Sequence, residues 1–443
     1  MNPAWKPRVS PAGLVRLGAL AAAMMIPSAA LAQDTAAQGQ ITFARDIAPV
    51  LQRSCQHCHR PGSIAPMPLL TYEQVRPWAR SIKQRVVGRE MPPWYIDRHV
   101  GVRKFKGDLS LTDAEIAKIA TWVDTGAPLG NPADLPPPRQ FSDLDQWHIG
   151  KPDVVITMPL EHIVKAYGPD QSLDVKVELP FKEDVYIQAV ETKPANPQSF
   201  RVIHHATTNL IEDEDDPTGF FFNEYALGKN GDIFPENTGR LIKAGSTMNW
   251  NLHLHSIGEE IPASVHMALK LYPKGVVPKY VLFTQHMGDN TELDLPAGQV
   301  SRHDGYFRLP KPAVVTAFQP HMHNRGKAQC MEAIFPDIRA DSARPGPART
   351  ETLSCVSNYQ FGWHITYPYA DEVAPILPAG TIMHVISWHD NSSANKWNPN
   401  PRNWAGYGSR TIDDMSFAWV SLYYLDEADY QQRVAVKNKK TSN

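Results

Sequence analysis

The sequence has almost no excess of charge of either sign. Its 44 lysines and arginines nearly balance 46 aspartates and glutamates, so the 443-residue chain has a net charge of −2 at pH 7. Proteins that bind nucleic acid or an anionic membrane surface usually carry a basic excess, which attracts the phosphates. We therefore expect neither partner for this chain, which is long enough for two or three domains.

Long apolar runs are also missing. The run at residues 17–26 is too short to span a bilayer, and no later segment has the length or apolarity to do so. This run follows a basic start and precedes Ala30-Leu31-Ala32, which is typical of a signal peptidase site. The sequence therefore predicts a cleaved secretory signal over residues 1–32, with a retained anchor as the alternative, and no stable membrane insertion.

Cysteine is scarce, and its four residues fall into two pairs. The first pair lies in Cys55-Gln56-His57-Cys58-His59, the spacing at which two thiols form thioethers with a haem and the next histidine ligates its iron. A zinc or thiol-redox pair is the alternative, but zinc would need two more ligands nearby. We predict one covalent c-type haem. Bacteria attach haem to this motif outside the cytoplasm, so motif and signal both indicate the periplasm.

The second pair, Cys330 and Cys355, lies far downstream of the haem motif. In an oxidising compartment such a pair is most simply a disulfide that closes a loop. A copper or zinc role for the pair is the alternative. We expect the disulfide.

Apolar residues repeat at helical spacing only before about residue 130. Two such stripes flank the haem motif, Phe43, Ile47, Val50 and Leu51 before it and Val75, Trp78, Ile82 and Val86 after it. A third helix is predicted to begin at the capping box of Thr112 and Glu115 and to end at Gly126. Three helices around the motif predict an all-α cytochrome c domain over residues 38–130.

The haem iron needs a sixth ligand, and in cytochromes c a methionine is usual. Met91 is our choice, because it lies on a proline-stiffened loop, Arg89-Glu90-Met91-Pro92-Pro93-Trp94, between the second and third helices. Met67 is the rival. It follows His59 by only eight residues, which makes the opposite face of the haem harder to reach. His99 is a further alternative.

Beyond a proline-rich linker at residues 131–150, the pattern changes to short β-rich runs. They lie at residues 173–179, 248–255, 280–283, 314–323 and 381–388. Many short strands separated by Pro, Gly, Asn and Asp predict sandwiches or jelly rolls. We expect two all-β domains, at residues 151–295 and 296–432, and a disordered basic tail at residues 433–443.

Histidines gather in this β-rich half in three sets. The sets are His204-His205, His253-Leu254-His255 and His321-Met322-His323. Histidines two residues apart on a strand share a face and can bind one metal ion, whereas adjacent ones need a strand end or a bulge. Imidazoles bind zinc, copper, iron or nickel, and the redox motif favours copper or iron. Isolated histidines such as His364 are expected to be surface or core residues.

The order HH, H, HxH and DM of these sets and of Asp414-Met415 resembles the copper type II, ascorbate-dependent monooxygenases, over residues 150–430. The resemblance implies two copper ions in two jelly-roll-like domains. It implies that one copper, which stores and passes electrons, is bound by His204, His205 and His255. It implies that the second, where O2 binds and the substrate C–H bond is cleaved, is bound by the catalytic residues His321, His323 and Met415. His255 is preferred to His253, and Met415 to Met383.

Taken together, the resemblance implies a periplasmic copper-dependent monooxygenase that hydroxylates a small substrate. We expect the haem to replace ascorbate and to receive electrons from an external donor. Gln319, Phe417 and Trp419 stand where the peptide-amidating enzyme binds a carboxylate, which favours a neutral or apolar substrate. The alternatives are a haem and copper protein that transfers electrons or binds copper without oxygenating anything, and a reductase of a small nitrogen or oxygen compound.

Overall fold

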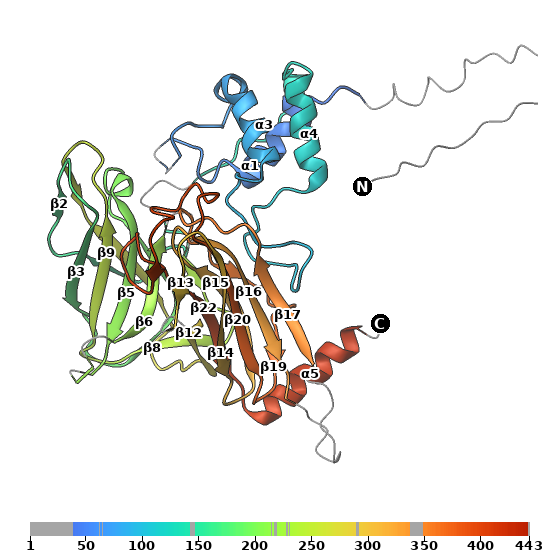
Figure 1. The fold of residues 1–443 in the computed structure, drawn as a ribbon. Coiled ribbons are helices and arrows are strands. Elements are labelled where there is room, and N and C mark those ends of the chain that lie inside the picture. The colour runs from blue at the N-terminus through green and yellow to red at the C-terminus, as the bar shows by residue number, and fades with distance from the viewer. Residues whose placement is uncertain are drawn as a thin grey trace, which may run out of the picture. The chain divides into compact units, whose positions relative to one another are not determined.

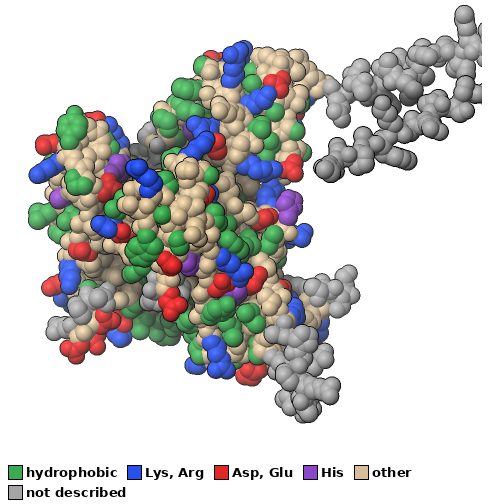
Figure 2. Space-filling view, in the orientation of Figure 1, with side chains coloured by type: hydrophobic (Ala, Val, Ile, Leu, Met, Phe, Trp, Pro, Cys, Tyr) green, Lys and Arg blue, Asp and Glu red, His purple; other side chains and the backbone are tan. Residues whose placement is uncertain are grey.

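The computed structural model describes residues 39–61, 63, 65–141, 147–213, 215–216, 219–226, 229, 231–288, 292–336 and 349–441 (Figure 1). The predicted signal at residues 1–32 lies outside this part of the chain. All described helices and strands belong to one compact unit, residues 42–443. In the described residues, no helix is long and apolar enough to cross a membrane. Figure 2 shows acidic and basic side chains interspersed over the face in view, as the near-zero net charge predicts.

Short helices and helical turns make up the ordered elements before residue 135. They are η1 (Phe43–Ile47), α1 (Ala48–Ser54), α2 (Tyr72–Val75), η2 (Arg76–Trp78), α3 (Ala79–Val87), α4 (Asp113–Asp124) and η3 (Pro132–Asp134). The predicted capping box at the start of α4 is present: the Thr112 hydroxyl accepts from the Glu115 N–H, and the Glu115 carboxylate accepts from the Thr112 N–H. The third predicted helix is therefore confirmed, whereas an all-α cytochrome c domain stays a prediction.

The β-rich half contains one long sheet and two shorter ones. The ten-stranded sheet has the order β1 (Val154–Thr157), β11 (Val265–Leu271), β4 (Val185–Pro194), β8 (Thr238–Ile242), β12 (Tyr280–Gly288), β22 (Phe417–Tyr424), β15 (Ala313–His321) and β18 (Tyr367–Pro368), with β7 (Asp232–Ile233) beside β4 and β19 (Ile376–Leu377) beside β15. One four-stranded sheet has the order β3 (Gln171–Glu178), β9 (Thr247–Leu254), β5 (Ile203–Ile211) and β6 (Phe220–Ala226). The other has the order β14 (Val300–Arg308), β20 (Ile382–Asp390), β16 (Gly326–Ile334) and β17 (Thr350–Val356).

Two smaller pairings and a helical turn complete the described part of this half. β2 (His162–Val164) pairs with β10 (Ile261–Ala263), and β13 (Asp294–Leu295) pairs with β21 (Ala405–Gly406), while η4 (Ser199–Arg201) leads into β5. Each of the five β-rich runs predicted from the sequence overlaps a strand. The β-rich character of this half is thus confirmed.

The long sheet joins the two predicted β domains. Its only parallel pair, β8 with β12, places Thr238 opposite Tyr280 and Gly239 opposite Val281, and all other described pairs are antiparallel. One hydrophobic core cluster extends across both halves, from Trp250 on β9 to Phe318 on β15. The two sandwiches therefore share a sheet and a core, and the boundary at residue 295 stays a prediction.

The loop that follows Met91 packs against the second half of the β region. The Tyr95 N–H donates to the Tyr367 hydroxyl at 3.1 Å, and the Asp97 N–H donates to the Cys355 carbonyl at 2.7 Å. The Trp94 ring contacts the Tyr367 ring edge-on, with centroids 5.0 Å apart. These contacts connect the segment after the haem motif to β17 and β18.

The C-terminal tail is helical, not disordered as expected from the sequence. α5 extends over Glu427–Thr441 beyond the last strand. The Asp429 carboxylate near its start accepts a hydrogen bond from the Tyr280 hydroxyl at 2.8 Å, and the Arg433 guanidinium lies over the rings of Tyr280 and Tyr423. These contacts with β12 and β22 stabilise the helix through tertiary packing. The charge pattern of the tail does not show such contacts.

The predicted disulfide between Cys330 and Cys355 is confirmed. The two cysteines are direct partners in the register of β16 and β17, with Cα atoms 4.0 Å apart. Their sequence separation is 25 residues. The bond therefore closes a loop of a length at which disulfides stabilise folded proteins appreciably.

We expect the double variant Cys330→Ser/Cys355→Ser to lose about 2–4 kcal/mol of unfolding free energy, because the unfolded chain regains the entropy of an open loop. Urea denaturation of both proteins at pH 7 measures this difference. Wild-type protein treated with a thiol reductant is the control, since thioethers of a haem would survive that treatment. Equal stability of all three samples would contradict the prediction.

Candidate metal centre

The first histidine set lies where β5 begins beside β9. Ile203 pairs with Leu254 and His205 pairs with His253, so the register shifts by one residue and His204 is the extra residue on β5. This shift is the bulge that two adjacent histidines need in order to face one metal ion. The sequence indicated that requirement, and the structure meets it.

Three imidazoles meet at this bulge, those of His204, His205 and His253. One potential ligand atom from each lies within 4.8 Å of the other two. The His253 Nδ1 lies 3.2 Å from the His205 Nε2, and the three ring centroids are 5.0–5.5 Å apart. The Asp170 carboxylate lies 3.1 Å from the His253 Nε2 and orients that ring from behind. Three imidazoles arranged in this way could hold a metal ion.

The structure groups His253 with the adjacent pair, while the predicted ligand His255 stays a prediction. His253 belongs to β9 and stands directly opposite His205, whereas His255 follows the last residue of the strand. The His255 N–H donates to the Val202 carbonyl at 3.0 Å. His255 is still close enough to His204 to help lower its pKa, but the structure groups His253 with the pair.

The second histidine set lies at the end of β15. His321 is the last residue of this strand, and its ring stacks on that of Phe417 with centroids 4.5 Å apart. The rings of His321 and His323 are 5.7 Å apart. The His323 Nδ1 lies 3.2 Å from the Asp413 carbonyl, which can only accept, so Nδ1 carries the proton and Nε2 keeps its lone pair. His323 is therefore in the tautomer that binds metal through Nε2.

A buried carboxylate holds this segment in place. Asp414 is fully buried and accepts from the main-chain N–H groups of His323 at 2.8 Å and Arg325 at 3.1 Å. It lies 3.3 Å from the His389 Nε2. Burial raises the pKa of Asp414, but His389, His323 and the hydrogen bonds together lower it further, so the group is ionised at neutral pH.

Met415 is held beside the second set by the same carboxylate. Its N–H donates to Asp414 at 3.0 Å, and its carbonyl accepts from the His389 Nε2 at 3.0 Å. Met383, the alternative, is fully buried in the middle of β20. The acidic pair that preceded Met415 in the sequence pattern thus has a physical role: it fixes the main chain that carries both His323 and Met415.

His364 was expected to be an ordinary core or surface residue, but the structure places it between the two histidine sets. Its side chain is buried, with 3% exposure. Its ring centroid lies 4.9 Å from that of His321 and 5.9 Å from those of both His204 and His205. No local spacing pattern identified it, because it comes from a loop with no second histidine near it in the sequence.

The buried imidazoles of this centre lack ordinary hydrogen-bond partners. Among the described residues, no partner is found for Nδ1 of His204, His205 and His321 or for Nε2 of His364. Burial lowers the pKa of His204 to about 4, and burial followed by repulsion from neighbouring histidines lowers those of His205, His321 and His364 well below the usual value. These imidazoles are neutral at pH 7, the state that binds metal ions.

Comparison with known proteins does not assign the chain to a family. No model of a protein family matches the sequence, and no curated protein gives a significant match. Similar solved structures include VP2 of infectious bursal disease virus, with 10% identity over 63% of this chain and 74% of that chain and a TM-score of 0.20. The exported protein XepA of PBSX has 9% identity over 56% of this chain and 99% of that chain, with a TM-score of 0.15. Such low TM-scores carry no argument about fold or function.

The haem motif follows α1. The His59 Nδ1 lies 3.1 Å from the Met67 carbonyl, which leaves Nε2 for a metal ion. Burial raises the pKa of Cys55 to about 12 and that of Cys58 to about 11. A thiol-redox pair needs a lowered pKa, so these values argue against that alternative. Within the described residues, neither cysteine belongs to a group of three metal-ligating side chains, as a zinc site would require.

The two methionines considered as the sixth haem ligand lie in different surroundings. The Met67 carbonyl lies within hydrogen-bond distance of the His59 Nδ1. The Met67 main chain therefore lies on the same side of the predicted haem as His59. Met91 lines a cavity of about 320 Å³ together with Trp94 and His99. No residue of Cys55–His59 is among the described residues that line this cavity, so Met91 stays a prediction.

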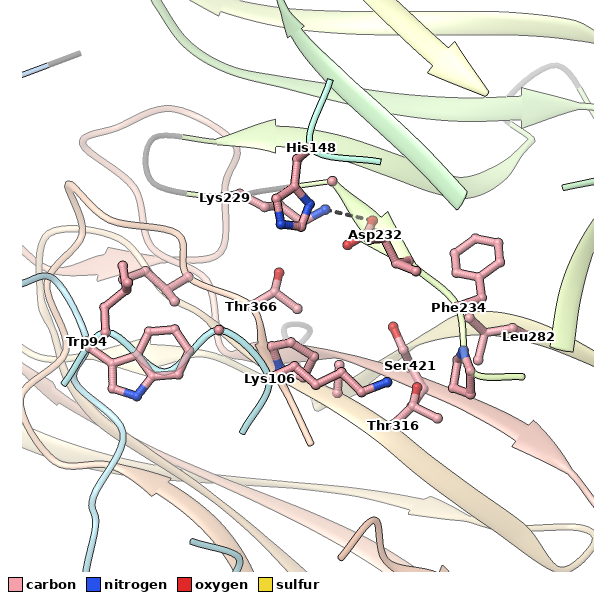
Figure 3. Close-up of a pocket in the computed structure, with 18 of the residues that line it drawn as sticks. Trp94, Lys106, His148, Lys229, Asp232, Phe234, Leu282, Thr316, Thr366 and Ser421 are labelled. Atoms are coloured by element: carbon pink, nitrogen blue, oxygen red, sulfur yellow. Dashed lines mark hydrogen bonds and ion pairs between the residues drawn. The ribbon is translucent and has the colours of Figure 1, made fainter. Parts of the chain in front are cut away.

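A cavity of about 280 Å³ lies beside the haem motif (Figure 3). Its lining includes Cys58 and Trp94 from the N-terminal region, Thr316 and Ser421 from the long sheet, and Thr366. Three basic side chains also line it, those of Lys106, Lys229 and Arg240. Thr366 is two residues from His364, so the segment 364–366 extends from the cavity to the histidine sets.

We expect the metal-free protein to lose stability between pH 7 and pH 5. An unfolded histidine takes up a proton near pH 6.5, whereas the folded His204 does so only near pH 4, because burial disfavours the charged ring. Its stabilising contribution is full above pH 6.5 and is lost as the pH falls through this window. Urea unfolding at the two pH values should differ by about 1–2 kcal/mol for this group.

The variant His204→Asn serves as the control for this prediction, since it keeps a polar side chain and removes the titrating ring. Its stability should change less between pH 7 and pH 5 than that of the wild type. An identical pH dependence in the two proteins would show that His204 is not a source of acid sensitivity.

Proposed function

We propose that this chain is a periplasmic copper-dependent monooxygenase that hydroxylates a C–H bond of a small neutral or apolar substrate and receives its electrons through a covalent c-type haem. The observation that carries the proposal is the convergence of two histidine sets around buried imidazole nitrogens without hydrogen-bond partners. An unpartnered buried nitrogen costs stability, and a metal ion is the ligand that uses several of them at once.

The ligand sets fit two copper ions of different character. His204, His205 and His253 would hold one through three imidazoles, and His321, His323 and Met415 would hold the other with a softer thioether that favours Cu(I). When bound, these ions supply one-electron transfer at the first set and O2 reduction with substrate hydroxylation at the second. His255, the ligand predicted from the sequence, is the alternative to His253 as the third imidazole of this set.

The surrounding residues supply positioning and an apolar wall. Asp414 fixes the main chain of His323, and the side chains of His323 and His364 are buried. Phe417 stacks on His321, and Trp419 contacts Phe417 edge-on, with ring centroids 5.0 Å apart. A flat apolar substrate is the chemical class that these rings would hold.

The position of Gln319 also argues against a carboxylate substrate. Gln319 is buried, and its amide nitrogen donates to the Glu224 carboxylate. Its amide oxygen accepts from the Thr366 hydroxyl. Both ends of the side chain are therefore engaged within the protein. An arginine at this position could bind a carboxylate, whereas this glutamine has no group left to do so.

The haem motif supports the electron supply that the reaction needs. Hydroxylation converts R–H, O2, two electrons and two protons into R–OH and water, so a reductant must deliver two electrons one at a time. Cys55, Cys58, His59 and Met91 would hold the haem, which an external donor reduces. Cys58 and Thr366 line the same cavity, and the chain leads from Thr366 to His364 in two residues. We propose this connection as the path of the electrons.

A haem and copper protein that only transfers electrons is the second candidate. The short ring distances from His364 to both sets favour it, because a transfer centre gains from closely spaced metal ions. Oxygen consumption coupled to a hydroxylated product would support the monooxygenase. Copper that stays reduced under air in the presence of candidate substrates would favour the carrier.

Metal analysis of the exported protein tests the ligand sets. We expect one iron and two copper ions per chain, with an absorption spectrum typical of haem c, because the chain offers one CxxCH motif and two histidine sets. Zinc in place of copper after expression in copper-replete medium would contradict the proposal.

Stopped-flow reduction tests the path from haem to copper. We expect His59→Ala, which lacks the iron ligand, to slow copper reduction by a haem-specific protein donor by at least about 10-fold, since the direct route is lost. Reduction by dithionite, a small molecule that reaches both metals, should change little and is the control. Normal copper reduction by the protein donor in the variant would contradict the haem's role.

A further inference from the structure

We propose that His364 is a metal ligand, the third imidazole of the copper site formed by His321 and His323. This inference rests on the proposed copper function and names a residue that the histidine pattern of the sequence does not include. The His364 ring is the nearest ring to His321 among the other histidines of the centre, with centroids 4.9 Å apart. His364 lies in the loop before β18. The other histidines of the centre lie on or next to β5, β9 and β15.

A structural histidine usually lies beside a hydrogen-bond acceptor. His364 is surrounded by other imidazoles instead. Its Nε2 is buried and has no hydrogen-bond partner among the described residues. The charged or titratable groups that act on it are His321, His204, His323 and His253, with no carboxylate among them. Phe361 covers it from the side, with ring centroids 5.5 Å apart. Among the described residues, only His204, His205 and His253 have potential ligand atoms within 4.8 Å of one another, so His321, His323 and His364 would have to draw together around the cation that satisfies this nitrogen.

Other buried histidines of the β region show what a structural role looks like. The His384 Nε2 lies 2.6 Å from the Asp304 carboxylate, and its Nδ1 lies 3.4 Å from that of Glu332. The His389 Nε2 is satisfied by Asp414 and the Met415 carbonyl. Each of these rings has an anionic or carbonyl partner on at least one nitrogen, although the His389 Nδ1 is also buried without a partner among the described residues. His364 is equally buried, and its neighbourhood consists of other rings.

Ligation by His364 would change the character of the second copper site. With His321, His323 and His364 the site has three imidazoles even without Met415, a set that holds Cu(II) as well as Cu(I). Because His364 is also 5.9 Å from both His204 and His205, the two sites are parts of one continuous histidine cluster. Electrons would then pass between the copper ions through contacting rings.

Copper titration of the full-length protein against a chromophoric chelator tests this assignment in His364→Ala. We expect the variant to bind one copper equivalent with at least about 100-fold lower affinity, since even a residue that only supports a ligand contributes about 10–100-fold. The other equivalent should keep its affinity within about two-fold. His384→Ala, which removes a buried histidine outside the centre, is the matched control and should keep both affinities.

Rescue by exogenous imidazole separates ligation from a structural role. In His364→Gly, added imidazole should restore the weakened equivalent and its Cu(II) electron paramagnetic resonance spectrum, whereas a fold defect would not respond. A His364→Ala or His364→Gly protein that binds both equivalents like the wild type would overturn the assignment. So would loss of both equivalents without rescue. Wild-type protein that binds no copper would instead overturn the proposed function itself.

Discussion

The candidate centre depends on the continuity of one β-sheet through both halves of the β region. The parallel pair of β8 with β12 joins the strands of the first half to those of the second. His321 ends β15 in this long sheet, and the bulge at His204 lies in a neighbouring sheet that packs on the same hydrophobic core. Two sandwiches connected only by a linker could not keep histidines from both halves within 5.9 Å of one ring. The shared sheet supplies that constraint.

Polar groups at the centre fall into two kinds, and the difference indicates what each does. The Asp414 carboxylate is buried and fully engaged by main-chain N–H groups and by His389, so it is a positioning group. The imidazoles of His205, His321 and His364 each have a buried nitrogen without a partner among the described residues, although the His205 and His321 residues are only partly buried. Each unsatisfied group costs about 1–3 kcal/mol, and a bound metal ion would offset that cost for the imidazoles it ligates.

Much of this arrangement could be predicted from the sequence, and the failures have specific causes. Strand periodicity located the β-rich runs. The bulge expected for the adjacent pair His204-His205 is present. The grouping of His253 with this pair could not be predicted, because the sequence does not show that β9 ends at residue 254, opposite the bulge. His364 was not recognised because its neighbouring histidines come together only through tertiary packing. The helix at the C-terminus was not predicted because its contacts with β12 are also distant in the sequence.

The segment at residues 364–366 links the position of the histidine sets to that of the cavity beside Cys58. Its first residue contacts both histidine sets, and its last residue lines the cavity beside Cys58 and bonds to Gln319 on β15. A three-residue segment anchored at both ends cannot shift at one end without disturbing the other. Any movement that widens the cavity to admit a haem edge would therefore be felt at His364. The proposed electron inlet and the candidate metal centre are in this sense mechanically coupled through residues 364–366, which neither motif shows by itself.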